Sequence, residues 1–151
     1  MMAASCYAGS FLPNTEQEKS VDINFAAPEH LTVSFDQVPG LMAGKTLGGV
    51  DIAKLTVDST SIKEFGVRAV SGALLDSIGS GWTISGKNSG NPISVGFSGK
   101  DMGKSHGPIL WNGGKFIAFD TNVPLYITTL GDQDISPDTY PITVDVVGYQ
   151  P

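Results

Sequence analysis

Cysteine is almost absent from this chain. Cys6 is the only cysteine among 151 residues, so no disulfide can link two parts of the chain. The length suits a single domain. Without covalent cross-links, such a domain must obtain its stability from its hydrophobic core or from partner chains.

Basic residues, histidines and long apolar runs are also scarce. Nine Lys and Arg stand against 15 Asp and Glu, which gives a net charge of −6 and argues against nucleic acid or an anionic membrane surface as a partner. No apolar run approaches the roughly 20 residues that a membrane-spanning helix needs. With two histidines and scattered carboxylates, we expect no metal and no cofactor.

No motif in the sequence indicates an enzyme. His30 and His106 have no recognisable Ser, Cys or carboxylate motif around them, and we interpret both as solvated loop residues. Asp132, Asp134 and Asp138 resemble a cation-binding run, but the Gly and the distal Glu of an EF-hand loop are missing. We therefore predict a solvated acidic loop in a protein without catalytic residues.

The first eight residues resemble the end of a secretory signal peptide, with Ala8 preceding Gly9 at a small-residue cleavage site. The basic start and most of the apolar core of such a signal are missing. We interpret residues 1–8 as a signal remnant, which predicts an exported protein. The alternative is a cytosolic protein with one free thiol.

Glycine and proline are abundant, at 19 and 9 residues, and they separate short segments in which apolar and polar residues alternate. This pattern is typical of an antiparallel β-sandwich without a helical layer. Asn112-Gly113 supplies the positive φ that a tight hairpin needs. Strands are predicted at 31–35, 52–57, 62–70, 82–84, 92–97, 109–111, 116–119, 123–129 and 140–146. Loops are predicted at 41–49, 85–91, 99–107 and 132–138, with at most one helical turn near 73–78.

The N-terminal stretch 11–25 has the pattern of an edge strand. Val21, Ile23 and Phe25 alternate with polar residues, and the same face reaches Phe11 after a polar middle. Pro13 fits an edge because it cannot donate a ladder hydrogen bond. Apolar anchors at both ends suit a segment that another chain grips through its backbone, and the alternative is an ordinary tail followed by a first strand.

The final stretch has the clearest strand pattern and no strand after it. Tyr140, Ile142, Val144 and Val146 share one face. Because an apolar strand with an open edge promotes aggregation, proteins normally cover it. We expect another segment to cover this one.

Seven stretches resemble one family of pilins. They are GSFLPN (9–14), KSVDI (19–23), IAKL (52–55), KEFGVR (63–68), GKN (86–88), WNG (111–113) and DTYPITVDVVGYQP (138–151). The last of these is the most specific. On these residues the chain resembles the major pilin of the Saf-type atypical fimbriae, which the chaperone–usher pathway assembles.

The resemblance implies an incomplete immunoglobulin-like β-sandwich that lacks its final strand, completed by a donor strand from a neighbouring subunit. It implies a signal remnant at 1–8, a donor extension at 9–27 and a pilin domain at 28–151. The candidate donor residues are Phe11, Pro13, Val21, Ile23 and Phe25. The candidate acceptor groove is formed by Leu31, Val33, Phe35, Ile142, Val144 and Val146.

The resemblance also implies the partners. They are further copies of the chain in a head-to-tail homopolymer, a periplasmic chaperone that lends a strand before assembly, an outer-membrane usher, a minor tip subunit and a host receptor. The implied location is a fimbrium on the cell surface, reached through the periplasm, and the implied function is cell adhesion.

A self-contained secreted β-sandwich that acts as an adhesin or binding domain is the alternative, with the N-terminal stretch folded onto its own final strand. Trp82, Trp111 and Tyr126 offer aromatic surface for adhesion. We predict, however, that the two tryptophans are core residues.

Overall fold

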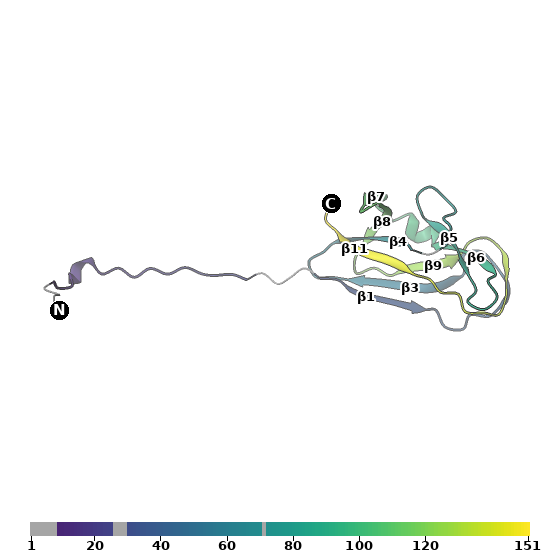
Figure 1. Cartoon of the computed structure of the whole chain (residues 1–151), viewed down its shortest axis with the longest axis horizontal. Coiled ribbons are helices and arrows are strands. Elements are labelled where there is room, and N and C mark those ends of the chain that lie inside the picture. Colours follow the sequence, from purple (N-terminus) through teal and green to yellow (C-terminus); the bar gives the residue numbers. More distant parts are fainter. Residues whose placement is uncertain (1–8, 26–29, 71) are drawn as a thin grey trace, which may run out of the picture.

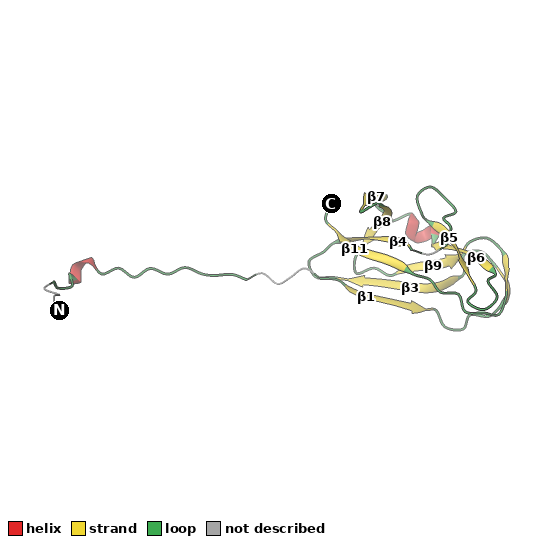
Figure 2. Cartoon of the chain, in the orientation of Figure 1, coloured by secondary structure: helices red, strands yellow, loops and turns green. Residues whose placement is uncertain are grey.

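The computed structural model describes residues 9–25, 30–70 and 72–151. Two antiparallel sheets pack face to face, and an extended N-terminal segment lies outside them (Figures 1 and 2). The predicted signal remnant, residues 1–8, lies outside the described residues. None of the described helices is long and apolar enough to cross a membrane.

The first sheet has five strands in the order β1-β3-β9-β6-β5. Their bounds are β1 Thr32–Gln37, β3 Asp51–Asp58, β9 Leu125–Thr129, β6 Pro92–Phe97 and β5 Gly81–Ser85. The second sheet has four strands in the order β11-β4-β8-β7. Their bounds are β11 Val144–Tyr149, β4 Glu64–Ala69, β8 Gly114–Asp120 and β7 Pro108–Trp111. The predicted all-β sandwich is confirmed.

The core between the sheets is built from the apolar faces of these strands. Trp82, Phe97, Phe119 and Phe65 form a chain of aromatic contacts, with ring centroids 5.1, 5.6 and 6.1 Å apart. Aliphatic side chains from β3 and β9 complete the core. Alternation along each strand directs these residues inward, since successive side chains point to opposite faces.

The predicted hairpin at Asn112-Gly113 is confirmed, since both residues have positive φ (48° and 74°) and join β7 to β8. The predicted loops 41–49 and 132–138 were wrong in part. They contain β2 Gly44–Thr46 and β10 Gln133–Ile135, which pair with each other. Each of these strands has only three residues, which is too short to show an alternation of apolar and polar residues. Each forms because it pairs with the other, which is distant in the sequence.

Two further local predictions differ from the structure. The loop 99–107 begins with a helical turn, α1 Gly99–Met102, which the Ser98 side chain caps. No helix forms at 73–78; instead the Asp76 carboxylate accepts hydrogen bonds from the amides of Ile78, Gly79 and Ser80. A carboxylate that binds nearby amides stabilises a turn in competition with a helix.

The stretch 11–25, predicted to be an edge strand gripped by another chain, pairs with no strand of its own chain. Residues 9–25 are all exposed and form no ladder, and Pro13–Thr15 form a 3₁₀ turn in which the Thr15 amide donates to the Leu12 carbonyl (3.0 Å). The segment runs away from the sandwich as an extended trace (Figure 1). A lone extended segment has no partner for ladder hydrogen bonds, so it lacks the interactions that define a strand.

The final strand begins later than predicted. Tyr140 and Ile142 precede β11, because the segment before Val144 bonds to loops rather than to a sheet. The Lys87 amide donates to the Thr139 carbonyl (2.7 Å), and the Val70 amide donates to the Thr143 carbonyl (3.0 Å).

Candidate functional site

Each sheet ends in a strand with one open edge. Within the part of the chain that the structure describes, β1 pairs with β3 alone and β11 pairs with β4 alone. The free edges therefore present unpaired backbone groups, which can template pairing with another strand.

Partly buried apolar side chains line the space between these edges. Leu31, Phe35, Ile142, Val144 and Val146 pack against the core from this side, and Val33 is 46% exposed. These six residues, which we call the acceptor groove, are those that the resemblance to the pilin family assigned to it. A hydrophobic core that continues into a half-exposed apolar row lacks a covering layer on that side.

The two ends of the acceptor groove differ. At one end the β11 backbone lies close to the β1 side, since a Cβ placed on Gly148 would lie 3.7 Å from Leu31 Cδ1 and 3.2 Å from Ile62 Cδ1. At the other end, Phe35 and Ile142 border the same cavity. Segments 31–35 and 142–148 therefore run in opposite directions along the groove.

The cavity at the Ile142 end has a volume of about 780 Å³. Its lining includes the apolar side chains of Ile52, Ile84, Ile93 and Ile135 in addition to Phe35 and Ile142. A space of this size and composition accepts a large apolar side chain.

Asp138 also lines this cavity. Its carboxylate accepts hydrogen bonds from the Ser89 amide (2.7 Å), the Ser89 hydroxyl (2.6 Å) and the amides of Asn88 (3.1 Å) and Thr139 (2.7 Å). These bonds hold the pKa of Asp138 far below its usual value, and the two from Ser89 have the largest effect. A Cβ at Gly86 would overlap this carboxylate, so the glycine permits the close approach. Asp138 thus lies at the surface, as predicted for this acidic loop, and its carboxylate also binds neighbouring loop groups.

The candidate donor residues do not contact the groove of their own chain. The side chains of the four apolar anchors are exposed to solvent, with Phe11 98%, Val21 78%, Ile23 68% and Phe25 93% exposed. Pro13 is exposed in the 3₁₀ turn. One chain thus contains both an apolar groove and an apolar extension, and the two do not contact each other. The extension does not fold onto the final strand of its own chain, as the self-contained alternative requires.

The prediction that both tryptophans are core residues is confirmed for Trp82 and wrong for Trp111. Trp82 is fully buried and packs on Phe97. Trp111 is 54% exposed and lies edge-on to Phe116, 5.7 Å between centroids. On the edge strand β7 about half of Trp111 remains exposed, so the prediction of a core residue was wrong there.

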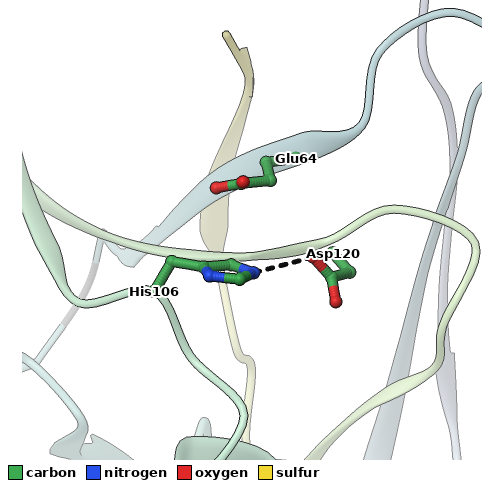
Figure 3. A group of neighbouring side chains, drawn as sticks. All are labelled: Glu64, His106 and Asp120. Carbon is green, nitrogen blue, oxygen red and sulfur yellow. Dashed lines mark hydrogen bonds and ion pairs between the residues drawn. The ribbon is translucent and has the colours of Figure 1, made fainter. Parts of the chain in front are cut away.

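Sequence reasoning missed one polar cluster. His106 lies in an exposed loop, as predicted, but its Nε2 is 2.7 Å from Asp120 Oδ1, and Glu64 lies beside the pair (Figure 3). The hydrogen bond to Asp120 raises the pKa of His106, and the charges of Glu64 and Asp120 add to the effect. The three residues are far apart in the sequence, so no local sequence motif predicts that they lie together. His30, also exposed, has Thr32 Oγ1 3.2 Å from its Nε2.

Comparison with known proteins identifies the family. A family model described as Saf-pilin pilus formation protein matches residues 9–151, and the chain belongs to this family. The comparison with curated proteins finds no match.

Solved structures share the fold. The minor tip subunit HdaB of the Escherichia coli Hda pilus is 12% identical, with a TM-score of 0.63 over 81% of this chain and 84% of that chain. The Salmonella SafD adhesin is 17% identical, with a TM-score of 0.63 over 78% and 83%. AggB, a minor subunit of E. coli aggregative adherence fimbriae type I, is 12% identical, with a TM-score of 0.59 over 78% and 84%. At these identities the likeness shows the fold alone, an immunoglobulin-like sandwich that lacks its final strand.

Proposed function

We propose that this chain is a structural fimbrial subunit that polymerises by donor-strand exchange, in which the extension (residues 9–27) of one copy inserts its apolar C-terminal part into the acceptor groove of the next. The observation that carries the proposal is that one chain contains both an open apolar groove and an exposed extension with matching alternation. An added strand supplies ladder hydrogen bonds for affinity and alternate side chains for register.

The spacing of apolar residues suggests the register. Val21, Ile23 and Phe25 have the same two-residue spacing as Val146, Val144 and Ile142. If the donor runs antiparallel to β11 and Phe25 faces Ile142, then Ile23 faces Val144 and Val21 faces Val146. Lys19 then faces Gly148, where the groove narrows and polar side chains can reach solvent.

The cavity favours this direction over the reverse. In the antiparallel arrangement Phe25 enters the cavity beside Ile142, and Phe11 extends past Pro151 as an anchor outside the groove. In a parallel arrangement with the same three anchors, the smaller Val21 would face Ile142 at the cavity, and Phe25 would face Val146 toward the narrow end at Gly148. A small side chain in the wide space and a large ring in the narrow one would pack less well.

The energetics support a durable fibre. Burying the three groove anchors contributes roughly 1.5–3 kcal/mol each before entropic costs, and ladder hydrogen bonds add about 0.5–1.5 kcal/mol apiece. The contact joins two different surfaces, so it does not close on itself and propagates into a filament.

The proposal extends to the assembly partners. We infer export through the periplasm, a chaperone that fills the groove before assembly, an outer-membrane usher, and surface fimbriae that mediate adhesion to a host receptor. Membership of the Saf-pilin family supports these partners.

We also infer that the chain is a major subunit in the body of the fibre, because it carries a donor extension as well as a groove. The second candidate is a minor subunit near the tip, which the resemblance to structures of minor and tip subunits favours. Polymerisation of the purified chain alone into long fibres supports the first candidate. Short assemblies that end after a few copies support the second.

Substitution in the donor tests the proposal. We expect Ile23→Asp to block polymerisation and to leave chaperone binding intact, because the chaperone does not use the extension. Asp22→Asn, on the opposite face, serves as the matched control and should polymerise. Equal loss of polymerisation and chaperone binding in Ile23→Asp would refute these roles.

A second test uses the chain cut to start at Ala26, with a peptide of residues 9–27. We expect an unstable cut chain that binds one peptide and shows a large rise in melting temperature. A stable monomer that ignores the peptide would instead favour a self-contained sandwich.

A further inference from the structure

The Glu64, His106 and Asp120 side chains, which we call the EHD cluster, lie at the surface of the second sheet. One ligand atom of each lies within 4.8 Å of the others. They come from three separate places: the start of β4, the loop after α1 and the end of β8 (Figure 3).

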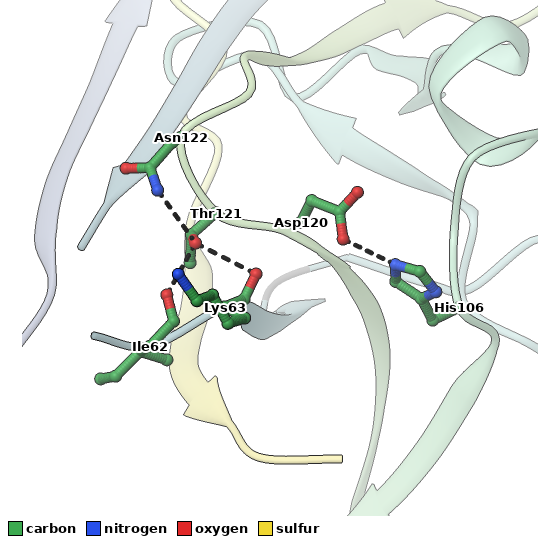
Figure 4. A network of polar contacts seen from close by, with 6 residues as sticks. All are labelled: Ile62, Lys63, His106, Asp120, Thr121 and Asn122. Carbon is green, nitrogen blue, oxygen red and sulfur yellow. Dashed lines mark hydrogen bonds and ion pairs between the residues drawn. The ribbon is translucent and has the colours of Figure 1, made fainter. Parts of the chain in front are cut away.

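The backbone beneath the EHD cluster is held by hydrogen bonds. The Thr121 amide donates to the Lys63 carbonyl (3.0 Å), and the buried Thr121 hydroxyl donates to the Ile62 carbonyl (2.7 Å) (Figure 4). These contacts tie the start of β4 to the end of β8. The His106 amide donates to the Ala118 carbonyl (2.8 Å), which fixes the loop on the same strand. The backbone that carries the three side chains is thus held in place, and only side-chain rotations are needed to bring their ligand atoms to one point.

The charges of the EHD cluster are unbalanced. Glu64 and Asp120 are directly opposite each other in the β4–β8 ladder, where like charges are unfavourable. Among the described residues, Asp120 forms an ion pair with His106 alone, and Glu64 forms no ion pair. A cation placed between the carboxylates would remove this repulsion.

We propose that the EHD cluster binds a divalent cation of the zinc class, with one imidazole and two carboxylates as protein ligands and water at the remaining position. Imidazole nitrogen and carboxylate oxygen are ordinary zinc ligands, and they disfavour calcium, which prefers oxygen alone. Tetrahedral ligands at zinc distances lie about 3.4 Å apart. His106 and Asp120 therefore separate slightly, and Glu64 moves inward by rotation of its side chain.

The bound ion would tie together the β4–β8 pair and the 106 loop. It would raise the melting temperature of the domain, since a ligand that binds only the folded state stabilises it. This role is independent of donor-strand exchange, because the EHD cluster lies outside the acceptor groove.

Zinc titration of the full chain tests the proposal. The experiment uses a Cys6→Ser background, because a thiolate is itself a zinc ligand. Calorimetry should show one zinc per chain, reversed by a chelator. X-ray absorption should show nitrogen and oxygen ligands including a single imidazole. Zinc should also raise the melting temperature.

Variants separate the EHD cluster from adventitious binding. We expect His106→Gln to abolish binding and Glu64→Gln to weaken it at least about tenfold. The matched control His30→Gln changes the only other histidine and should bind as before. Absence of saturable binding, loss of binding in His30→Gln, or full binding by Glu64→Gln would each overturn the proposal. The stabilisation by zinc should vanish in His106→Gln even if that variant melts at a different temperature.

Discussion

Phe25 is the donor residue whose removal should weaken subunit contact most. It is 93% exposed in the free extension, and the proposed register inserts it into the cavity of about 780 Å³ at the Ile142 end of the groove. Full burial of a phenylalanine side chain contributes roughly 1.5–3 kcal/mol. Since each 1.4 kcal/mol is tenfold in affinity, Phe25→Ala should weaken donor binding about 10- to 140-fold.

Competition between peptides measures this loss. A labelled peptide of residues 9–27 is bound to the acceptor chain starting at Ala26, and unlabelled wild-type or variant peptides displace it. Glu18→Ala, in the polar middle of the extension, is the control and should displace nearly as well as wild type. We expect Phe11→Ala to lose less affinity than Phe25→Ala, because Phe11 lies outside the groove in this register.

A double-mutant cycle tests the contact itself. Phe25→Ala in the peptide and Ile142→Ala in the acceptor should show a coupling energy of about 0.5–3 kcal/mol, as expected for side chains in contact. The pair Phe11→Ala and Ile142→Ala should show coupling near zero. Zero coupling for Phe25, or strong coupling for Phe11, would refute the proposed register and direction.

Three further predictions concern the stability of the domain. The folded-state pKa of Asp138 lies far below 3.8, so its stabilisation is fully present well above this value and is lost as the pH falls below about 4 toward the folded pKa. Acid unfolding of Asp138→Asn should therefore be less steep than that of the wild type, and equal slopes for the two would contradict this. Thr121→Val leaves the Ile62 carbonyl without its hydroxyl donor and should cost about 1–3 kcal/mol in denaturant unfolding, with Thr56→Val on β3 as the control. Leu55→Ala removes a fully buried side chain and should cost about 2–5 kcal/mol. A loss below 1 kcal/mol would mean that this part of the core is loosely packed, in conflict with the structure.

The sequence was most informative where a signal is local. Alternation in 52–57 and 92–97 predicted β3 and β6, and Asn112-Gly113 predicted the β7–β8 hairpin, because side-chain direction and positive φ depend on neighbouring residues alone. The short strands β2 and β10 escaped prediction because each is stabilised by the other across the sequence. The same holds for the EHD cluster, whose members meet only through sheet pairing.

Composition and the alternation of apolar and polar residues predicted the all-β class and the apolar anchors Val21, Ile23 and Phe25, since the period of two is a local property of a strand. The six groove residues were assigned through the resemblance to the pilin family, and that assignment stays a prediction. The tertiary structure alone shows that the groove narrows at Gly148 and opens into a cavity at Ile142, and that Asp138 links two loops beside that cavity. These features arise from side chains brought together from different sheets and loops. The alternation of residues along one strand carries no information on the space that remains between two strands after the sheets have packed.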